Sequence, residues 1–272
     1  MAAQLFSSSS REEHRPSLAA PLGGEFPWIE DGDLLVRLAR DHDEVRAAQR
    51  VRFEVFALEL QGRGRDDGSA LDVDPFDDHC DHLLLIDRRE ERVVGTYRLQ
   101  TEARARGGIG FYCDQEFILD DLPAEVRARS VELGRACILD SHRSGAGILA
   151  LWRGIIAYTL AHGARYLFGC SSLTGVCERT ARVAEAWIDG SRHRHPDLAV
   201  RARGERSPRR LEVDPREVEA FRPPRLFASY LRYSSRVCSG AALDREFGTT
   251  DFLVLFDFEG LSPRLRRLLI EG

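Results

Sequence analysis

The stretch SVELGRACILDSHRSGAGILALWRGIIAYTLAHGARYLFGCSS, residues 130–172, decides the fold. Residues 130–139 have the apolar content of a buried strand, interrupted by Gly134. Residues 148–162 place apolar side chains on one helical face, and 165–170 again read as a strand. The stretch therefore predicts a strand, a helix and a second strand in direct succession.

The turn HRSGAG at 142–147 enters this helix, and Gly163 suits its C-terminal cap. At such a turn, unpaired backbone N–H groups and the helix dipole favour an anion such as a phosphate. The alternative is an ordinary connection in which the glycines only ease the turn.

The flanking sequence alternates between strand and helix patterns. Asp41 and Glu44 have the spacing of a helix capping box. The further predicted elements are a strand at 33–40, a helix from Asp41 to about Leu60, a long irregular loop at 61–81, a hairpin at 82–100, helices at 176–189 and 226–237, a basic loop at 191–210 and a strand at 251–258. This order predicts an α/β (α+β) fold with a mixed sheet.

The amino-terminal end has a different composition. Residues 1–26 combine a serine run, mixed charges, proline and glycine without periodicity, which predicts a flexible tail. We expect residues 27–272 to form a single domain, with a core at 33–175 and a C-terminal elaboration at 176–272.

Composition excludes several classes of function. The chain has 272 residues, a hydrophobic content of 43% and a net charge of −5. No basic field of the kind that binds nucleic acid is present. All 39 cationic residues are arginines, so catalysis by a lysine amine is excluded.

The six cysteines are scattered without a CxxC pair, which is typical of free thiols in a reducing compartment. The sequence has no signal-peptide pattern and no apolar run long enough to span a membrane. We therefore expect a cytoplasmic protein, with contact to the inner membrane only at its periphery.

The chain resembles the GNAT acyltransferase superfamily, and within it the ornithine N-acyltransferases, also described as hemolysin-like. More distantly it resembles the acyl-homoserine-lactone synthases. The segments that carry the resemblance are VRFEVF (51–56), DPFDDHCDHLLL (74–85), VVGTYRL (93–99), FYCDQEF (111–117), VELGRACI (131–138), LWRGI (151–155) and YLFGCSSLTG (166–175). The resemblance implies a GNAT fold, in which a mixed central β-sheet has a splayed-strand acyl-binding cleft and is flanked by helices.

The same resemblance implies a set of site residues. The catalytic candidates are Glu132, Arg135 and Glu116; the acceptor-binding candidates are Asp74, Asp77, Arg52, Arg98 and Phe56; and the donor-binding candidates are Cys137, His142, Arg143, Ser144, Gly145 and Gly147. No metal and no cofactor is implied, because acyl-phosphopantetheine carrier protein is a co-substrate.

Several of these residues have a second interpretation. Glu132 should not be buried unpaired, and an ion pair with Arg135 would require a bulge at Gly134. That pair either serves catalysis or only fixes the bulge. Glu116 is the other candidate base, or else an exposed carboxylate at the end of a strand. Cys137 fits an inert buried thiol.

The acidic cluster around Asp74 and Asp77 would attract a cationic amino acid, unless it is only a solvated loop. Arg52 and Arg98 would bind the acceptor carboxylate or brace that loop as ion pairs. A zinc site at His79, Cys80 and His82 lacks a second ligand pair.

The donor turn departs from its superfamily. The coenzyme A loop there reads Q/R-x-x-G-x-G/A, whereas this chain has His142 in the first position. This favours a donor that presents only phosphopantetheine, as acyl carrier protein does. Arg143, Arg153 and the basic run at 192–210 are candidates for contact with the acidic carrier protein.

We therefore expect an N-acyltransferase that moves a (3-hydroxy)fatty acyl group from acyl carrier protein to the α-amine of ornithine, forming lyso-ornithine lipid. The first alternative is a carrier-protein-dependent synthase of N-acyl amino acids or homoserine-lactone-type signals. The alternative from another class is an inactive GNAT-like module that binds carrier protein or acyl chains. The amino acid, the chain length, the oligomeric state and the choice of base between Glu132 and Glu116 stay open.

Overall fold

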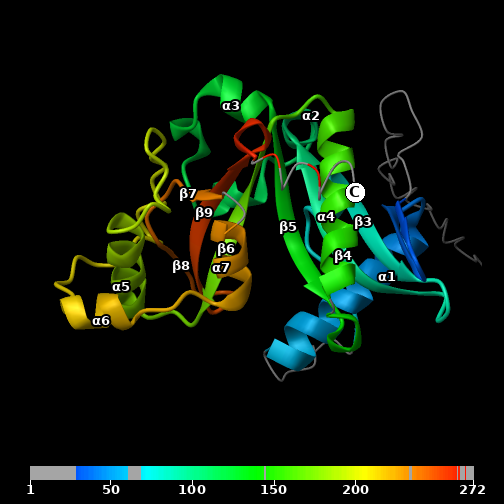
Figure 1. The fold of residues 1–272 in the computed structure, drawn as a ribbon, viewed down its shortest axis with the longest axis horizontal. Coiled ribbons are helices and arrows are strands. Elements are labelled where there is room, and N and C mark those ends of the chain that lie inside the picture. Colours follow the sequence, from blue (N-terminus) through cyan, green and yellow to red (C-terminus); the bar gives the residue numbers. More distant parts are fainter. Residues whose placement is uncertain are drawn as a thin grey trace, which may run out of the picture.

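One mixed sheet organises the protein (Figure 1). The computed structural model describes residues 29–60, 69–143, 145–232, 235–261, 263 and 267. Nine strands of this described part join in the order β1-β2-β3-β4-β5-β6-β9-β7, and β8 also pairs with β9. The expected mixed sheet is confirmed; the expected tail at 1–26 lies outside the described residues.

The strands are β1 (Ile29–Asp31), β2 (Leu34–Leu38), β3 (Asp81–Asp87), β4 (Arg92–Thr101), β5 (Ser130–Ile138), β6 (Tyr166–Thr174), β7 (Arg236–Val237), β8 (Ala242–Asp244) and β9 (Thr249–Asp257). The α-helices are α1 (His42–Arg52), α2 (Glu102–Gly107), α3 (Ala124–Ala128), α4 (Gly145–Ala161), α5 (Glu178–Asp189), α6 (Pro215–Ala220) and α7 (Arg225–Arg232). A π-helix, η1 (Phe53–Leu60), continues α1, and short 3₁₀ turns are η2 (Asp77–His79), η3 (Tyr112–Gln115), η4 (Leu119–Asp121), η5 (Asp140–His142) and η6 (Phe258–Gly260).

The strands β5 and β6 diverge in the middle of the sheet. They pair in parallel only from Ser130 with Tyr166 to Glu132 with Phe168, and Figure 1 shows them close at one end and apart at the other. Gly169 lies at the point of divergence, where a Cβ atom would stand 2.4 Å from the carbonyl oxygen of Leu133. The absence of a side chain there lets the two backbones approach before they separate.

The bulge expected at Gly134 is present one residue later. The pairing of β4 with β5 shifts register between Thr96 and Arg98, so that two β5 residues, Arg135 and Ala136, oppose one β4 residue. Arg135 has a φ of 49°, in the left-handed region that non-glycine residues rarely adopt. The bulge turns β5 away from β6 and aims Arg135 out of the regular ladder.

Helices α1 and α4 cover opposite faces of the sheet. Gly154 in α4 packs so closely on β2 and β3 that a Cβ would meet Val36 at 2.7 Å and Leu83 at 3.0 Å. Arg52, at the end of α1, donates to Asp77, which also accepts from Arg98 on β4. Because side chains alternate along a strand, Arg98 points to the opposite side of β4 from Leu99. The charged side chains of the site therefore collect on the α1 face.

Most predicted elements are confirmed, with differences at their ends, and residues 61–68 of the loop expected at 61–81 lie outside the described residues. Gly163 has a φ of 61° directly after α4, as a C-terminal cap requires. Asp41 caps α1 by accepting from the N–H of Glu44, but the Glu44 carboxylate accepts from the N–H of Arg40 rather than closing a box. The helix expected over 226–237 ends at Arg232, because residues 236–237 pair with β9 as β7.

Candidate functional site

Three arginines and three aspartates form a largely buried ion-pair network on the α1 face. Its members are Arg52, Arg98, Arg135, Asp72, Asp74 and Asp77. Arg52 is fully buried and bonds Asp77 at 2.7 Å and Asp72 at 2.8 Å. Burial alone would raise the pKa of Asp77, but hydrogen bonding and charge from Arg52 outweigh it, and the pKa falls well below its ordinary value.

Arg98 joins the network from β4. Its Nη1 lies 2.5 Å from Oδ1 of Asp74 and 3.1 Å from Oδ1 of Asp77. Arg52 and Arg98 both brace the acidic segment as ion pairs, and binding of the acceptor carboxylate by either arginine stays a prediction. Three positive charges balance three negative ones, so Asp74 and Asp77 do not form an uncompensated acidic patch.

The expected ion pair between Glu132 and Arg135 is wrong. The left-handed backbone of Arg135 carries its side chain to Asp74, where Nη2 lies 2.9 Å from Oδ2. The guanidinium also lies over the rings of Tyr112 and Phe247, with its carbon 5.2 Å and 4.4 Å from the ring centres. Phe247 follows β8, so Arg135 links the two diverging parts of the sheet.

Glu132 binds the backbone instead. Its two carboxylate oxygens accept hydrogen bonds from the N–H groups of Tyr112 at 2.9 Å and Cys113 at 2.7 Å. The side chain is buried, and burial raises its pKa although these two bonds oppose the shift. Glu132 therefore holds the η3 turn against β5.

Glu116 is neither exposed nor at the end of a strand, which corrects that interpretation. It follows η3 and is 1% exposed. Burial, followed by the charges of Asp251 and Asp244, raises its pKa to about 9. Sequence reasoning missed both aspartates; the available signal was an acidic residue at the start of the apolar strand TTDFLVLFD (249–257).

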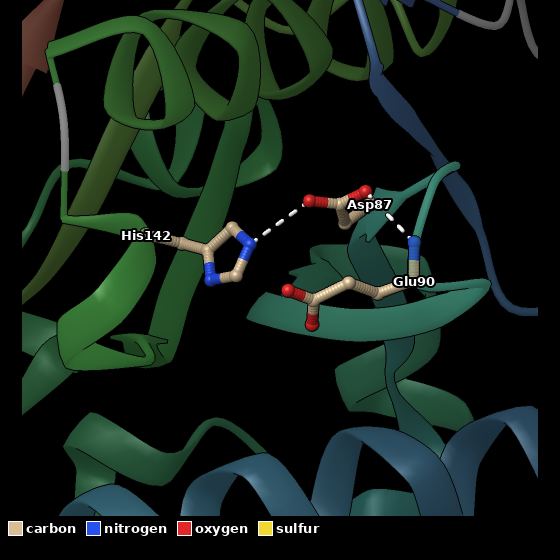
Figure 2. Close-up of side chains that lie close together, drawn as sticks. All are labelled: Asp87, Glu90 and His142. Carbon is tan, nitrogen blue, oxygen red and sulfur yellow. Dashed lines mark hydrogen bonds and ion pairs between the residues drawn. The ribbon is translucent and has the colours of Figure 1, made fainter.

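The donor turn is held by the hairpin between β3 and β4. His142 accepts or donates through Nε2 at 3.0 Å from Oδ2 of Asp87, and its Nδ1 lies 2.8 Å from Oγ of Ser141. Figure 2 shows the His142 ring directed to Asp87, with Glu90 beside it and its backbone N–H donating to Asp87. Both ring nitrogens are thus engaged, and the ring is directed at protein groups.

The remaining donor candidates lie around the start of α4, except that Ser144 is outside the described residues. Gly145 begins the helix, and a Cβ on Gly147 would stand 3.1 Å from the carbonyl oxygen of His142. Arg143 donates to the Ile138 carbonyl at 2.8 Å and pairs with Glu59 and Asp140.

Two other candidates belong to the core. Cys137 is 7% exposed, and burial raises the pKa of its thiol to about 12, as expected of an inert cysteine. Phe56 in η1 packs against the main core cluster.

Most arginines expected to face a carrier protein are already in ion pairs. Arg153 is 3.9 Å from Asp31, and the pairs in the basic run are Arg194 with Asp189, Arg201 with Asp121, Arg203 with Asp114, Arg206 with Asp244 and Arg209 with Glu178. The net positive field of this surface is smaller than the sequence indicates.

Two groups of side chains have a geometry that could hold a metal ion, within the part of the chain that the structure describes. One is Asp87, Glu90 and His142, at the surface; the other is Glu116, Asp244 and Asp251, which is buried. In the first group, His142 and Asp87 are already hydrogen-bonded to each other.

The divergent strands, the bulge and the helix that follows a glycine turn define a GNAT acyltransferase fold. In agreement, the sequence model of the acetyltransferase (GNAT) domain family matches residues 51–153. The solved structure of FeeM, an N-acyl amino acid synthase from uncultured soil microbes, superposes with a TM-score of 0.51 at 12% identity, covering 84% of this chain and 93% of that one.

Closer relatives define the family. An L-ornithine N(alpha)-acyltransferase of Rhodobacter capsulatus is 39% identical over 243 residues, which are 85% of this chain and 92% of the relative. One from Rhizobium meliloti is 34% identical over 264 residues, or 92% and 88%. The chain belongs to the L-ornithine N(alpha)-acyltransferase family. No helix among its described residues is long and apolar enough to cross a bilayer.

Proposed function

We propose that this protein transfers a (3-hydroxy)fatty acyl group from acyl carrier protein to the α-amine of L-ornithine and so forms lyso-ornithine lipid. The observation that carries the proposal is the identity of 39%, over 85% of this chain, to the L-ornithine N(alpha)-acyltransferase of Rhodobacter capsulatus. The reaction forms an amide bond between the amine nitrogen and the acyl carbon, and it breaks the thioester bond. The amine proton finally goes to the leaving thiol.

Glu132 is proposed as the group that takes the amine proton, directly or through a water. Its raised pKa makes it a stronger base than an ordinary carboxylate, and the two backbone hydrogen bonds fix its orientation. Each oxygen keeps a further lone pair for the proton.

Arg135 is proposed to bind the acceptor carboxylate. It is the member of the ion-pair network that lies between the two diverging parts of the sheet, over Tyr112 and Phe247. The rest of the ion-pair network holds Arg135 and the acidic segment in place; its members are Arg52, Arg98, Asp74 and Asp77.

The carrier protein is proposed as the donor because His142 occupies the position of the usual Gln or Arg and is engaged by Asp87. A phosphopantetheine has one phosphodiester, whose oxygens can accept hydrogen bonds from the N–H groups at the start of α4 without a further side chain. Arg143 is proposed to contact the acidic carrier protein. We also propose that the enzyme acts in the cytoplasm.

The test is an assay of purified protein with L-ornithine and 3-hydroxyacyl carrier protein, compared with the matching acyl-coenzyme A, with the product mass measured. We expect an Nα-acylated ornithine, at least about tenfold higher kcat/KM for carrier protein, and a KM for carrier protein that rises with salt. Equal kcat/KM for the two donors would refute the donor assignment. An acylated product of another amino acid only would refute the acceptor.

A further inference from the structure

Three buried carboxyl groups lie together away from the arginine network. Glu116, Asp244 and Asp251, here called the acidic triad, are 1%, 2% and 2% exposed. One oxygen of each lies within 4.8 Å of the others. The paired cation is Arg206, whose Nη1 is 3.2 Å from Asp244. One arginine does not balance three carboxylates, in contrast to the network around Arg52.

Two oxygens of the acidic triad have no hydrogen-bond donor among the described residues. They are Oε2 of Glu116 and Oδ1 of Asp251, both buried. The other oxygen of Asp251 accepts from Thr249 at 2.8 Å, and Asp244 accepts from the backbone N–H of Glu246 at 2.9 Å. Buried acceptors without a donor are rare in folded proteins. In the free protein the proton that Glu116 keeps lies between Glu116 and Asp251, and a ligand with N–H groups that displaces this proton would supply donors to both open oxygens.

The acidic triad lies beside β6 and β9, close to the point where β6 leaves β5. Glu116 lies 3.7 Å from Sγ of Cys170, which is two residues beyond the last β5–β6 pair on β6. Asp251 on β9 is the register partner of Ser172 on β6. Asp244 also accepts from the N–H of Phe247, and the ring of Phe247 lies under Arg135. Because Phe247 contacts both Asp244 and Arg135, a small molecule that contacts Arg135 lies close to the acidic triad.

We infer that the acidic triad binds the side-chain ammonium of a diamino-acid acceptor and thereby directs acylation to the α-amine. This inference rests on the proposed function. An ammonium has three N–H donors and no acceptor, which suits two unpartnered oxygens and a third carboxylate. Surrounding carboxylates favour the charged form of an amine, and a protonated amine is not a nucleophile. The bound ammonium is therefore protected, while the α-amine loses its proton and reacts.

The protonation of the acidic triad agrees with this role. Burial and the neighbouring aspartates raise the pKa of Glu116 to about 9, so the free protein keeps a proton in the acidic triad at neutral pH. The groups that face Glu116 are Asp251, Asp244, Arg206, Tyr112 and Cys170. A cation that enters the acidic triad replaces this proton, so the charge of the site changes little on binding.

The test compares L-ornithine with L-norvaline, which has the same carbon skeleton without the δ-amine. Binding is measured by calorimetry, and turnover with 3-hydroxyacyl carrier protein. We expect the wild type to prefer ornithine by at least about 100-fold, because loss of one partner of a buried charge pair has effects of that order. In Asp251→Asn, ornithine binding and kcat/KM should fall about 30- to 1000-fold, whereas those for norvaline should change less than about threefold.

Glu116→Gln is a second, isosteric variant, used if Asp251→Asn folds poorly; in calorimetry it should weaken the binding of ornithine by a similar factor and leave the binding of norvaline unchanged within about threefold. The exposed Asp197→Asn serves as the matched control and should leave both acceptors unchanged. Equal affinity of the wild type for the two acceptors, or equal losses for both in the variants, would overturn the inference. So would tight Mg²⁺ or Mn²⁺ binding that the variants abolish, together with loss of ornithine binding in EDTA. If the wild type discriminates in binding but forms no amide, the proposed function fails and the ammonium site stands.

Discussion

Replacing Glu132 by glutamine separates its positioning of η3 from its proposed role as a base, because the two roles predict different losses: a small loss of stability for the first and a large loss of kcat for the second. A glutamine keeps one carbonyl oxygen but places an NH₂ group against either the N–H of Tyr112 or that of Cys113, where Glu132 accepts at 2.9 Å and 2.7 Å. One hydrogen bond to a charged acceptor is lost, worth about 1.5–3 kcal/mol. At about 2–4 °C per kcal/mol for a chain of this size, Tm should fall by about 3–12 °C.

The catalytic effect is larger if Glu132 is the base. Well below the lowered Tm, kcat should fall about 10²- to 10⁴-fold. The residual kcat/KM for ornithine should then rise with pH in proportion to the neutral α-amine. The assay is stopped-time mass spectrometry of acyl-ornithine over pH 6–9, with calorimetric melting of each variant.

Gln100→Met is the matched control. Gln100 is the register partner of Glu132 on β4, is 1% exposed, and donates to the Gly110 carbonyl at 3.1 Å. It should lose about 1 kcal/mol of stability with unchanged kcat. If Glu132→Gln melts lower as expected but turns over within about threefold of wild type, Glu132 only positions η3, and the base assignment is refuted.

Three further predictions concern stability. Arg52→Met removes the nearer of the two arginines that pair with the buried Asp77, leaving Arg98 at 3.1 Å, and should cost about 3–5 kcal/mol of unfolding free energy in urea titration, whereas Arg88→Met, at an exposed pair, should cost less than about 1 kcal/mol. Gly169→Ala places a Cβ 2.4 Å from the Leu133 carbonyl oxygen and should cost at least about 1–3 kcal/mol by thermal melting; Gly107→Ala, with open space, should not. Because the folded pKa of Glu116, about 9, exceeds its ordinary 4.5, its contribution to stability is lost as pH rises between these values, so Glu116→Gln should melt higher than wild type at pH 8 and match it near pH 4. An unchanged difference across pH would contradict this.

The sequence predicted elements whose signal is local. The apolar runs of β3 and β4 and the face of α4 depend on neighbouring residues, and Gly163 marks the end of α4 by its own backbone requirement. Partners of charged side chains depend on distant segments. Glu132 and Arg135 are three residues apart, yet because of the bulge Glu132 binds the η3 turn and Arg135 binds Asp74. The spacing of the two residues in the sequence does not predict this difference in direction.

The acidic triad shows the same limit more strongly. Glu116 precedes Asp244 and Asp251 by more than 120 residues, and they meet because β9 returns beside β6. No periodicity reports such a meeting. The isolated acidic residue at the start of β9 was a readable signal, since a carboxylate in an apolar strand needs a partner when it is buried.

The two sides of the divergence solve the problem of buried charge in opposite ways. On the β5 side, three aspartates meet three arginines, so the network is neutral and holds the acidic segment without any ligand. On the β9 side, three carboxyl groups meet Arg206, and two oxygens have no donor among the described residues. That arrangement lowers stability as pH rises, because protons must leave a crowded buried site. A cation from the substrate removes this cost, so the side of the sheet that is less stable alone is the side that gains most from binding the acceptor.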